Sequence, residues 1–221
     1  MIYFCIRMNK IFFMSMRNII LTLLLCVAMP LFAQLAPIKV KYQGDRPTIS
    51  DFATALVSVD NADEDEDCDG LGESLNAFAY AWQAYQAGKT LPADDKLTVD
   101  SKNGYICYES KNDGYLLRVE MCYWNESDSR HKLFACNVSC FYDGRYQPGQ
   151  YDGIEFYRYD NAARQMTYDG DSDFRSIATD DGAWVSYALP RTGKDIVATV
   201  WHETDKEQKT LKWNGHGFVA P

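Results

Sequence analysis

The segment Leu117-Arg-Val-Glu-Met-Cys-Tyr123 places apolar side chains at every second position, with Arg118, Glu120 and Cys122 between them. Successive residues of a β-strand point to opposite faces of the sheet, so this period of two predicts a strand with one face in the core. The sequence Asn112-Asp113-Gly114 precedes the segment and is typical of a tight hairpin turn. The segment is therefore expected to pair with an antiparallel strand that contains Ile106 and Tyr108.

The same pattern continues after a polar loop at residues 125–131. The next apolar face is formed by Phe134, Cys136, Val138, Cys140 and Tyr142. Further strands are expected around residues 153–159, 163–168, 183–189, 195–201 and 208–213, with a short strand at Phe218. Short strands linked by Gly and Asp turns favour an antiparallel meander of about eight strands. The pattern leaves open whether these strands make an open sheet, a half-barrel or a sandwich.

Two helices are expected before the strands. Thr48 and Asp51 form a variant capping box, followed by one apolar stripe that ends near Val59. A second stripe, with Gly88 as its C-terminal cap, begins at Leu71 and ends at Tyr85. The predicted fold class is α+β, with two N-terminal helices packed on the antiparallel sheet.

The N-terminal stretch has the pattern of a secretory signal. Arg7, Lys10 and Arg17 are the only charges before residue 39, and an apolar run of about 14 residues follows them. That run is shorter than the ~20 residues that a membrane span needs. We predict a signal peptide at residues 1–33, cleaved after Ala33, and a single α+β domain at residues 34–221. The mature protein is then secreted or periplasmic and carries no stable membrane span.

The composition is acidic. The chain has 31 Asp and Glu against 22 Lys and Arg, and removal of the signal lowers the net charge from −9 to −12. A protein with this charge has no electrostatic attraction for phosphate backbones, so nucleic acid is excluded as an expected partner.

Five cysteines remain in the predicted mature protein: Cys68, Cys107, Cys122, Cys136 and Cys140. Cys136 and Cys140 are four residues apart on one strand, which separates them by about 13 Å. That distance is too long for one disulfide or one shared metal ion, so buried thiols are expected there. Cys107 and Cys122 are expected on the opposite face of the sheet, where a bridge from one of them to Cys68 stays open.

One acidic loop matches the start of a calcium-binding loop. Asp65, Asp67 and Asp69 alternate before Gly70, and Glu73 follows at the ninth position of the motif. The twelfth position is Asn76 instead of the usual bidentate Glu. The alternative is a solvated acidic loop that interacts favourably with the N-terminus of the next helix. Calcium is the one cofactor that the sequence suggests.

No catalytic residue is predicted. The three histidines, His131, His202 and His216, show no metal-binding spacing and are expected to be exposed to solvent. The sequence also contains no G-x-S-x-G nucleophile elbow. Acidic residues are so numerous that no carboxylate pair stands out as an acid–base pair.

Aromatic residues offer another route to function. The strand region contains four tryptophans: Trp124, Trp184, Trp201 and Trp213. Exposed on a sheet, they would stack on sugar rings or contact a protein partner. The alternative is that they fill the core and the cross-strand pairs.

Several patches between residues 48 and 218 resemble known proteins. These patches are Tyr105–Glu109, Met121–Asn125, Gly153–Asp160, Leu189–Asp195 and Leu211–Gly215. In them the chain resembles a group of exported single-domain proteins of unknown function from Bacteroides-type bacteria. The resemblance implies export and a single domain, and it implies no catalytic residue.

Three functions follow as hypotheses. The first is a secreted or periplasmic binding module whose partner, a protein or a glycan, is unknown. The alternatives are an envelope hydrolase that uses unidentified carboxylates and a calcium-stabilised structural domain. Two buried carboxylates with raised pKa values in a pocket would favour the hydrolase, and an exposed aromatic strip would favour the binding module.

Overall fold

The computed structural model describes residues 36–60, 72–149, 152–170 and 183–219. The chain divides into two units between Ala36 and Pro37, and the fold described below is that of the second unit. The predicted signal peptide at residues 1–33 lies outside the described residues. No helix among the described residues has the length and apolar character needed to cross a membrane.

The larger sheet has eight strands, all paired antiparallel. They are β1 (Ile38–Lys39), β2 (Asp95–Asp100), β3 (Tyr105–Asn112), β4 (Tyr115–Asn125), β5 (His131–Tyr142), β6 (Arg145–Tyr146), β7 (Gly153–Asp160) and β8 (Gln165–Gly170). Their order is β1-β8-β7-β5-β4-β3-β2, and β6 pairs with the end of β5. The hairpin expected around Asn112-Asp113-Gly114 is the β3–β4 hairpin.

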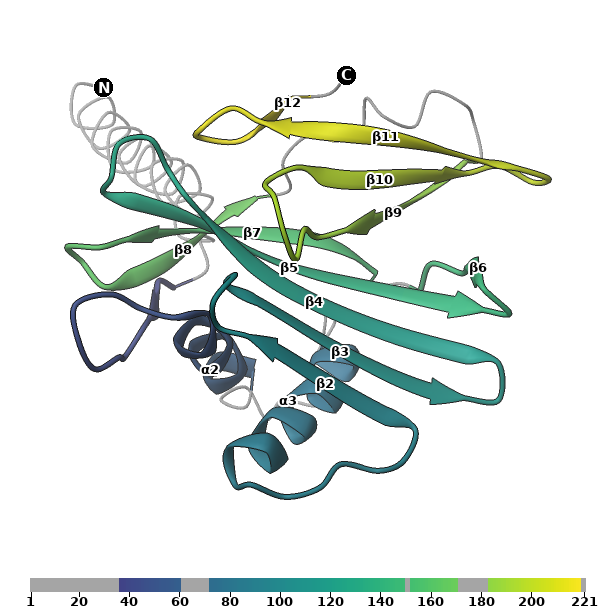
Figure 1. Cartoon of the computed structure of the whole chain (residues 1–221), viewed down its shortest axis with the longest axis horizontal. Coiled ribbons are helices and arrows are strands. Elements are labelled where there is room, and N and C mark those ends of the chain that lie inside the picture. The colour runs from purple at the N-terminus through teal and green to yellow at the C-terminus, as the bar shows by residue number, and fades with distance from the viewer. Residues whose placement is uncertain (1–35, 61–71, 150–151, 171–182, 220–221) are drawn as a thin grey trace, which may run out of the picture. The chain divides into compact units, whose positions relative to one another are not determined.

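The smaller sheet is formed by β9 (Trp184–Ala188), β10 (Ile196–Trp201), β11 (Lys206–Trp213) and β12 (Phe218–Val219). Its order is β12-β11-β10-β9, again antiparallel. Figure 1 shows this sheet on one side of the larger sheet and the two helices on the other. The predicted α+β class and antiparallel pairing are confirmed. The two-residue strands β1 and β6 were not predicted, because two residues are too few to show a period.

Both helices have the ends that the sequence indicates. Helix α2 spans Ile49–Asp60, and the Asp51 carboxylate accepts bonds of 2.7 Å from both the backbone N–H and the hydroxyl of Thr48. Helix α3 spans Gly72–Gln86. The N–H of Lys89 donates to the Ala84 carbonyl at 2.9 Å and Gly88 has a φ of 65°, which is a Schellman cap.

The helices bury their apolar stripes on the larger sheet. Phe52 of α2 is fully buried and its ring lies 5.1–5.4 Å from those of Tyr123, Phe134 and Tyr159. These three residues come from β4, β5 and β7, so one side chain joins the helix to three strands. Full burial of a Phe side chain stabilises the fold by about 1.5–3 kcal/mol relative to exposure.

A second core fills the space between the two sheets. Trp124 and Phe156 of the larger sheet pack there with Ile196, Ala198 and Leu211 of the smaller one. The apolar side chains on the two faces of β4 and β5 therefore serve two different cores. This explains why the alternating pattern of these strands identified the helix-facing core but did not reveal a second sheet.

The described cysteines, Cys107, Cys122, Cys136 and Cys140, form no disulfide with one another. Cys136 is fully buried on the helix side, as expected, whereas Cys140 is half-buried. Cys122 and Cys107 belong to the opposite face, in or beside the core between the sheets. Cys68 lies outside the described residues, so its bridge to either thiol stays a prediction.

Candidate functional sites

The predicted calcium ligands Asp65, Asp67 and Asp69 lie outside the described residues. Glu73 falls in the first turn of α3, where only the backbone is described. The structure therefore leaves the calcium loop as a prediction.

The four tryptophans have different environments. Trp124 is buried: its ring lies 5.7 Å from that of Trp213, and its Nε1–H donates to the Lys194 carbonyl at 2.8 Å. Trp201 is half-buried, donates to the Ser186 hydroxyl at 2.8 Å and has the Lys206 ammonium 4.7 Å from its ring centroid. Trp184 is 57% exposed. Of the four, Trp184 alone offers most of its surface to a ligand.

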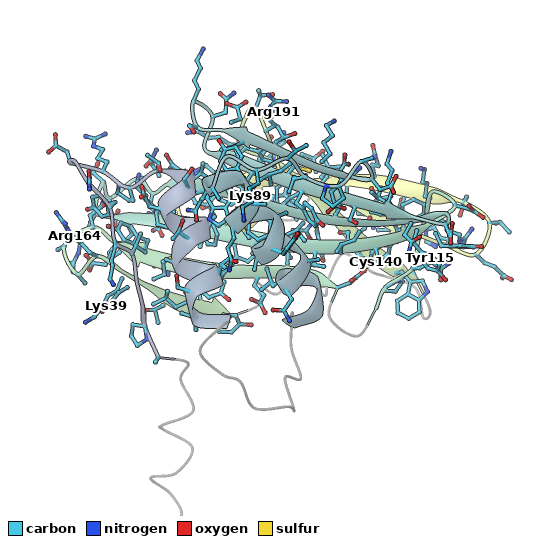
Figure 2. The ribbon with its side chains drawn as sticks, turned by 90° about the horizontal axis from the view of Figure 1, so that it is seen from below. Lys39, Lys89, Tyr115, Cys140, Arg164 and Arg191 are labelled. Atoms are coloured by element: carbon cyan, nitrogen blue, oxygen red, sulfur yellow. The ribbon has the colours of Figure 1, made fainter. Side chains whose placement is uncertain are left out.

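Two exposed tyrosines form an aromatic surface that the sequence analysis did not single out. Tyr115 and Tyr142 are direct cross-strand partners of β4 and β5, with ring centroids 4.6 Å apart. They are 58% and 42% exposed. Figure 2 shows Tyr115 and the neighbouring Cys140 beyond the helices, at the end of the strands. We call Tyr115 and Tyr142 the tyrosine pair.

Two adjacent turns support the tyrosine pair. Asp113 and Gly114 connect β3 to β4, and Asp143 and Gly144 connect β5 to β6; all four have positive φ, as a type I′ turn requires. The Asp143 N–H donates to the Gly114 carbonyl at 3.0 Å. A Cβ at Gly114 would lie 3.3 Å from the Tyr142 ring and 2.9 Å from the Asp143 carboxylate. Gly114 therefore lets the Tyr142 ring lie against the backbone of the neighbouring turn.

An open, shallow hollow lies beside Tyr115 of the tyrosine pair. It has a volume of about 380 Å³ and is lined by Asp94, Tyr115, Leu116 and residues 111–114. The lining residues include the aromatic Tyr115, the acidic Asp94 and Asp113, and the basic Lys111. This site therefore offers an aromatic face together with hydrogen-bond acceptors and a donor.

Glu120 is a buried carboxyl group between the two sheets. It accepts hydrogen bonds from the Tyr105 hydroxyl (2.6 Å), the Asn137 side-chain amide (3.3 Å) and the Leu189 backbone N–H (3.4 Å). Burial raises the pKa of Glu120, although these hydrogen bonds oppose the shift. Asn137 also donates to the Tyr187 carbonyl at 2.9 Å. Glu120 and Asn137 thus satisfy backbone groups in and next to the edge strand β9, which is a structural role.

A serine, a histidine and a glutamate meet where the β4–β5 loop contacts the β11–β12 turn. The Ser127 hydroxyl lies 2.8 Å from Nε2 of His216, and Nδ1 of His216 lies 3.0 Å from a carboxylate oxygen of Glu126. The Glu126 side chain is 4% exposed, and its other oxygen accepts a 2.8 Å bond from Nε of Arg158. The His216 side chain is 61% exposed. We call Ser127, His216 and Glu126 the Ser–His–Glu cluster.

An ion network continues from this cluster along the same loop. Asp128 accepts bonds from the His131 ring and from the backbone N–H groups of Arg130 and His131, which together hold the pKa of Asp128 well below its usual value. Glu126, Asp128 and His131 each offer a metal-ligand atom, within 4.8 Å of one another. Both carboxylate oxygens of Glu126 are already hydrogen-bonded, to Arg158 and to His216. A cation bound here would have to displace one of these partners.

The Ser–His–Glu cluster was not predicted, because its three residues come from distant parts of the chain. Ser127 and His216 are 89 positions apart, so no short motif contains both. Of the three histidines that were expected to be exposed, His216 is exposed, whereas His131 and His202 are half-buried. No pattern in the sequence indicated the partners of His216. The sequence contained one relevant feature: the polar loop at residues 125–131 and the turn Asn214-Gly215 each follow the end of a strand. Loops at strand ends can lie side by side in a folded protein.

Comparisons with protein-family models, with curated proteins and with solved structures found no match.

Proposed function

We propose that this protein is exported and acts as a binding module that holds neutral sugar rings on the tyrosine pair. The single observation that carries the proposal is the exposed, mutually packed pair Tyr115–Tyr142 beside a polar hollow. Export is supported by the predicted signal peptide at residues 1–33 and by the resemblance to exported proteins of Bacteroides-type bacteria.

The chemistry of the tyrosine pair suits a sugar ring. The face of an aromatic ring carries partial negative charge, so it attracts the weakly positive C–H groups on the flat side of a pyranose. The Asp94 and Asp113 carboxylates and the Lys111 ammonium line the adjacent hollow and can hydrogen-bond the hydroxyl groups at the edge of the sugar. The paired type I′ turns fix the Tyr142 ring before a ligand arrives, which reduces the entropy lost on binding.

A small rigid ligand fits this surface better than a protein partner does. A stable protein interface buries about 1,200–2,000 Å² in total and has an apolar centre. The large apolar side chains exposed among the described residues are distributed over several elements: Val59, Tyr80, Tyr85, Tyr115, Tyr142, Trp184 and Val219. Such scattered residues are normal for a protein surface, and only Tyr115 and Tyr142 pack against each other.

The charge of the protein favours neutral sugars over acidic ones. The chain has a net charge of −9, and Asp94 and Asp113 are next to the tyrosine pair. An acidic polysaccharide would be repelled over the Debye length of about 8 Å at physiological salt. Neutral polysaccharides feel no such repulsion.

The test is affinity electrophoresis in native gels that contain dextran, arabinoxylan or galactomannan, with alginate as the acidic comparison. We expect at least one neutral polysaccharide to retard the wild-type protein. Tyr115→Ala and Tyr142→Ala should each weaken that retardation about 10-fold, since an aromatic contact contributes about 1–1.5 kcal/mol. Tyr80→Ala is the matched control, because Tyr80 is 66% exposed and belongs to α3, whereas the tyrosine pair belongs to β4 and β5.

Two results would overturn the proposal. The first is that none of the neutral polysaccharides retards the wild-type protein. The second is retardation that Tyr80→Ala weakens as much as Tyr115→Ala does. Binding of a protein partner through Tyr115 and Tyr142, with no response to polysaccharides, also counts against the sugar-binding proposal.

A further inference from the structure

We propose that the Ser–His–Glu cluster is a nucleophilic site that hydrolyses carboxylic esters, an activity separate from the binding function proposed above. The inference depends on the order of contacts among the three side chains. Ser127 contacts His216, His216 contacts Glu126, and Glu126 is buried against Arg158.

This order matches the chemistry of an activated serine. A serine hydroxyl is a weak nucleophile until an adjacent base accepts its proton, and that base works best when a third group fixes its ring. With the proton on Nδ1, His216 donates to Oε2 of Glu126 and its Nε2 accepts from the Ser127 hydroxyl. Three side chains in this order identify such a site by geometry and not by sequence motif.

The backbone holds the cluster in place before any substrate arrives. The Ser127 N–H donates to the Gly215 carbonyl at 2.9 Å, which joins the β4–β5 loop to the β11–β12 turn. The Asn214 side chain accepts 3.0 Å bonds from the N–H groups of His216 and Gly217. Gly215 has a φ of 101°, and a Cβ there would lie 3.3 Å from the Ser127 hydroxyl oxygen. Glycine at this position therefore permits the close approach of serine and histidine.

The Glu126 side chain is more buried than the His216 ring that it orients. Its side chain is 4% exposed, and Arg158 adds a 3.3 Å contact to the His216 carbonyl besides its bond to Glu126. Arg158 therefore ties the carboxylate and the histidine backbone together. Glu126 and Arg158 act as positioning residues in this proposal.

Ser127 is exposed, so an ester on a large molecule can reach it. The backbone N–H of Asp128, the residue after the nucleophile, donates no hydrogen bond to the described residues and is available to the developing oxyanion.

The reaction has two balanced steps. In the first, the Ser127 Oγ–H proton moves to Nε2 of His216 while Oγ bonds to the ester carbonyl carbon; the C–O bond to the alcohol then breaks, and the alcohol oxygen takes the proton from Nε2. In the second, water bonds to the acyl carbon and gives a proton to Nε2. The acyl–Oγ bond breaks, Oγ recovers the proton, and a carboxylic acid leaves. No atom changes oxidation state.

The first experiment uses a fluorophosphonate probe, which labels activated serines covalently, followed by peptide mass spectrometry. We expect label on Ser127 of the full-length protein, and its loss in Ser127→Ala and in His216→Ala. Ser129→Ala is the control, because Ser129 is exposed in the same loop and its hydroxyl contacts no described histidine. It should be labelled at Ser127 like the wild type. Absence of label at Ser127 in folded protein overturns the proposal.

The second experiment measures p-nitrophenyl acetate hydrolysis against pH. Ser127→Ala and His216→Ala should each lower kcat about 100-fold or more, the usual contribution of general-base catalysis. Glu126→Gln should lower kcat with little change in KM and should shift the pH profile, because it changes how the ring is held. If Ser127 and His216 only clamp the loop to the turn, the variants will lower the Tm and leave the hydrolysis rate equal to that of Ser129→Ala. That result also overturns the proposal.

Discussion

The Tyr105 hydroxyl donates a 2.6 Å hydrogen bond to Oε1 of Glu120, and both residues are buried between the two sheets. They are diagonal neighbours on β3 and β4, since Tyr105 is opposite Cys122 and Glu120 is opposite Cys107. The bond fixes the carboxyl group that also receives the Leu189 N–H, beside the end of β9. One polar pair on the larger sheet thus holds the edge of the smaller sheet.

Tyr105→Phe should destabilise the fold by about 1–3 kcal/mol, because it removes a donor from a buried carboxyl group. The measurement is urea unfolding followed by tryptophan fluorescence. Tyr146→Phe is the matched control: Tyr146 is also buried, but its hydroxyl makes no hydrogen bond with the described residues. An equal decrease of the free energy of unfolding in the two variants would show that the Tyr105–Glu120 hydrogen bond does not stabilise the fold.

Acid should weaken the contact between Asp100 and Arg191. The Asn103 side chain, and then the Arg191 guanidinium at 2.8 Å, lower the pKa of Asp100 to about 2. A carboxyl group whose pKa is lower in the folded state than in the unfolded state stabilises the fold above the unfolded pKa of about 4. That contribution is lost as the pH falls from about 4 to 2. An NMR titration of the Asp100 carboxyl should give a midpoint near 2, and Arg191→Gln should raise it. A midpoint near 4 in the wild type would contradict the assignment.

Calcium should stabilise the protein if Asp65, Asp67, Asp69 and Glu73 bind it. For a dissociation constant of 10⁻⁴–10⁻³ M, which is typical of extracellular modules, 1 mM calcium adds about 0.4–1.4 kcal/mol. Thermal melting with calcium and with EDTA measures the gain. Asp67→Asn should abolish it, whereas Asp45→Asn, outside the loop, should retain it. An unchanged melting temperature at millimolar calcium would rule out the calcium loop.

Gly88→Ala should cost about 1–2 kcal/mol, because an L-residue with positive φ is strained. A Cβ at Gly88 would meet no atom within 4 Å, so the cost is conformational and not steric. Gly217→Ala is the control, since the space around Gly217 is also open and its φ lies outside the left-handed region. If Gly217→Ala lowers the stability as much as Gly88→Ala does, the positive φ of Gly88 is not the cause of the loss.

Export has a direct measurement. Intact-mass analysis of protein from the periplasm or medium should give a chain that begins at Gln34, as expected for cleavage after Ala33. Leu24→Arg places a charge in the apolar run and should block processing, whereas Leu35→Arg, beyond the predicted cleavage site, should leave export intact. Recovery of an unprocessed chain from the cytosol would contradict the signal-peptide prediction.

The features that the sequence predicted well depend on local chemistry. The Thr48–Asp51 cap and the Gly88 cap each involve residues within five positions of one another. The strands from Tyr105 to Tyr142 were also recognisable, because alternation within one strand reports its buried face. These local rules gave the α+β class and the positions of both helices.

The features that could not be predicted involve residues that only the folded chain brings together. Tyr115 and Tyr142 continue the same apolar alternation as Val119 and Val138, yet the first pair is exposed and the second is fully buried. The difference is that the helices cover the middle of the strands and not their end. Ser127 and His216 meet only because the smaller sheet packs on the larger one, which the pattern left open.

Phe52 of α2 depends on Tyr159 of β7 for part of its enclosure. A chain made from its N-terminus presents α2 well before β7 has been synthesised. The helix stripe therefore stays in contact with water, or with a chaperone, while most of the larger sheet is still to come. Complete covering of α2 therefore requires the chain as far as β7, and a chain cut before Tyr159 should remain open to proteases.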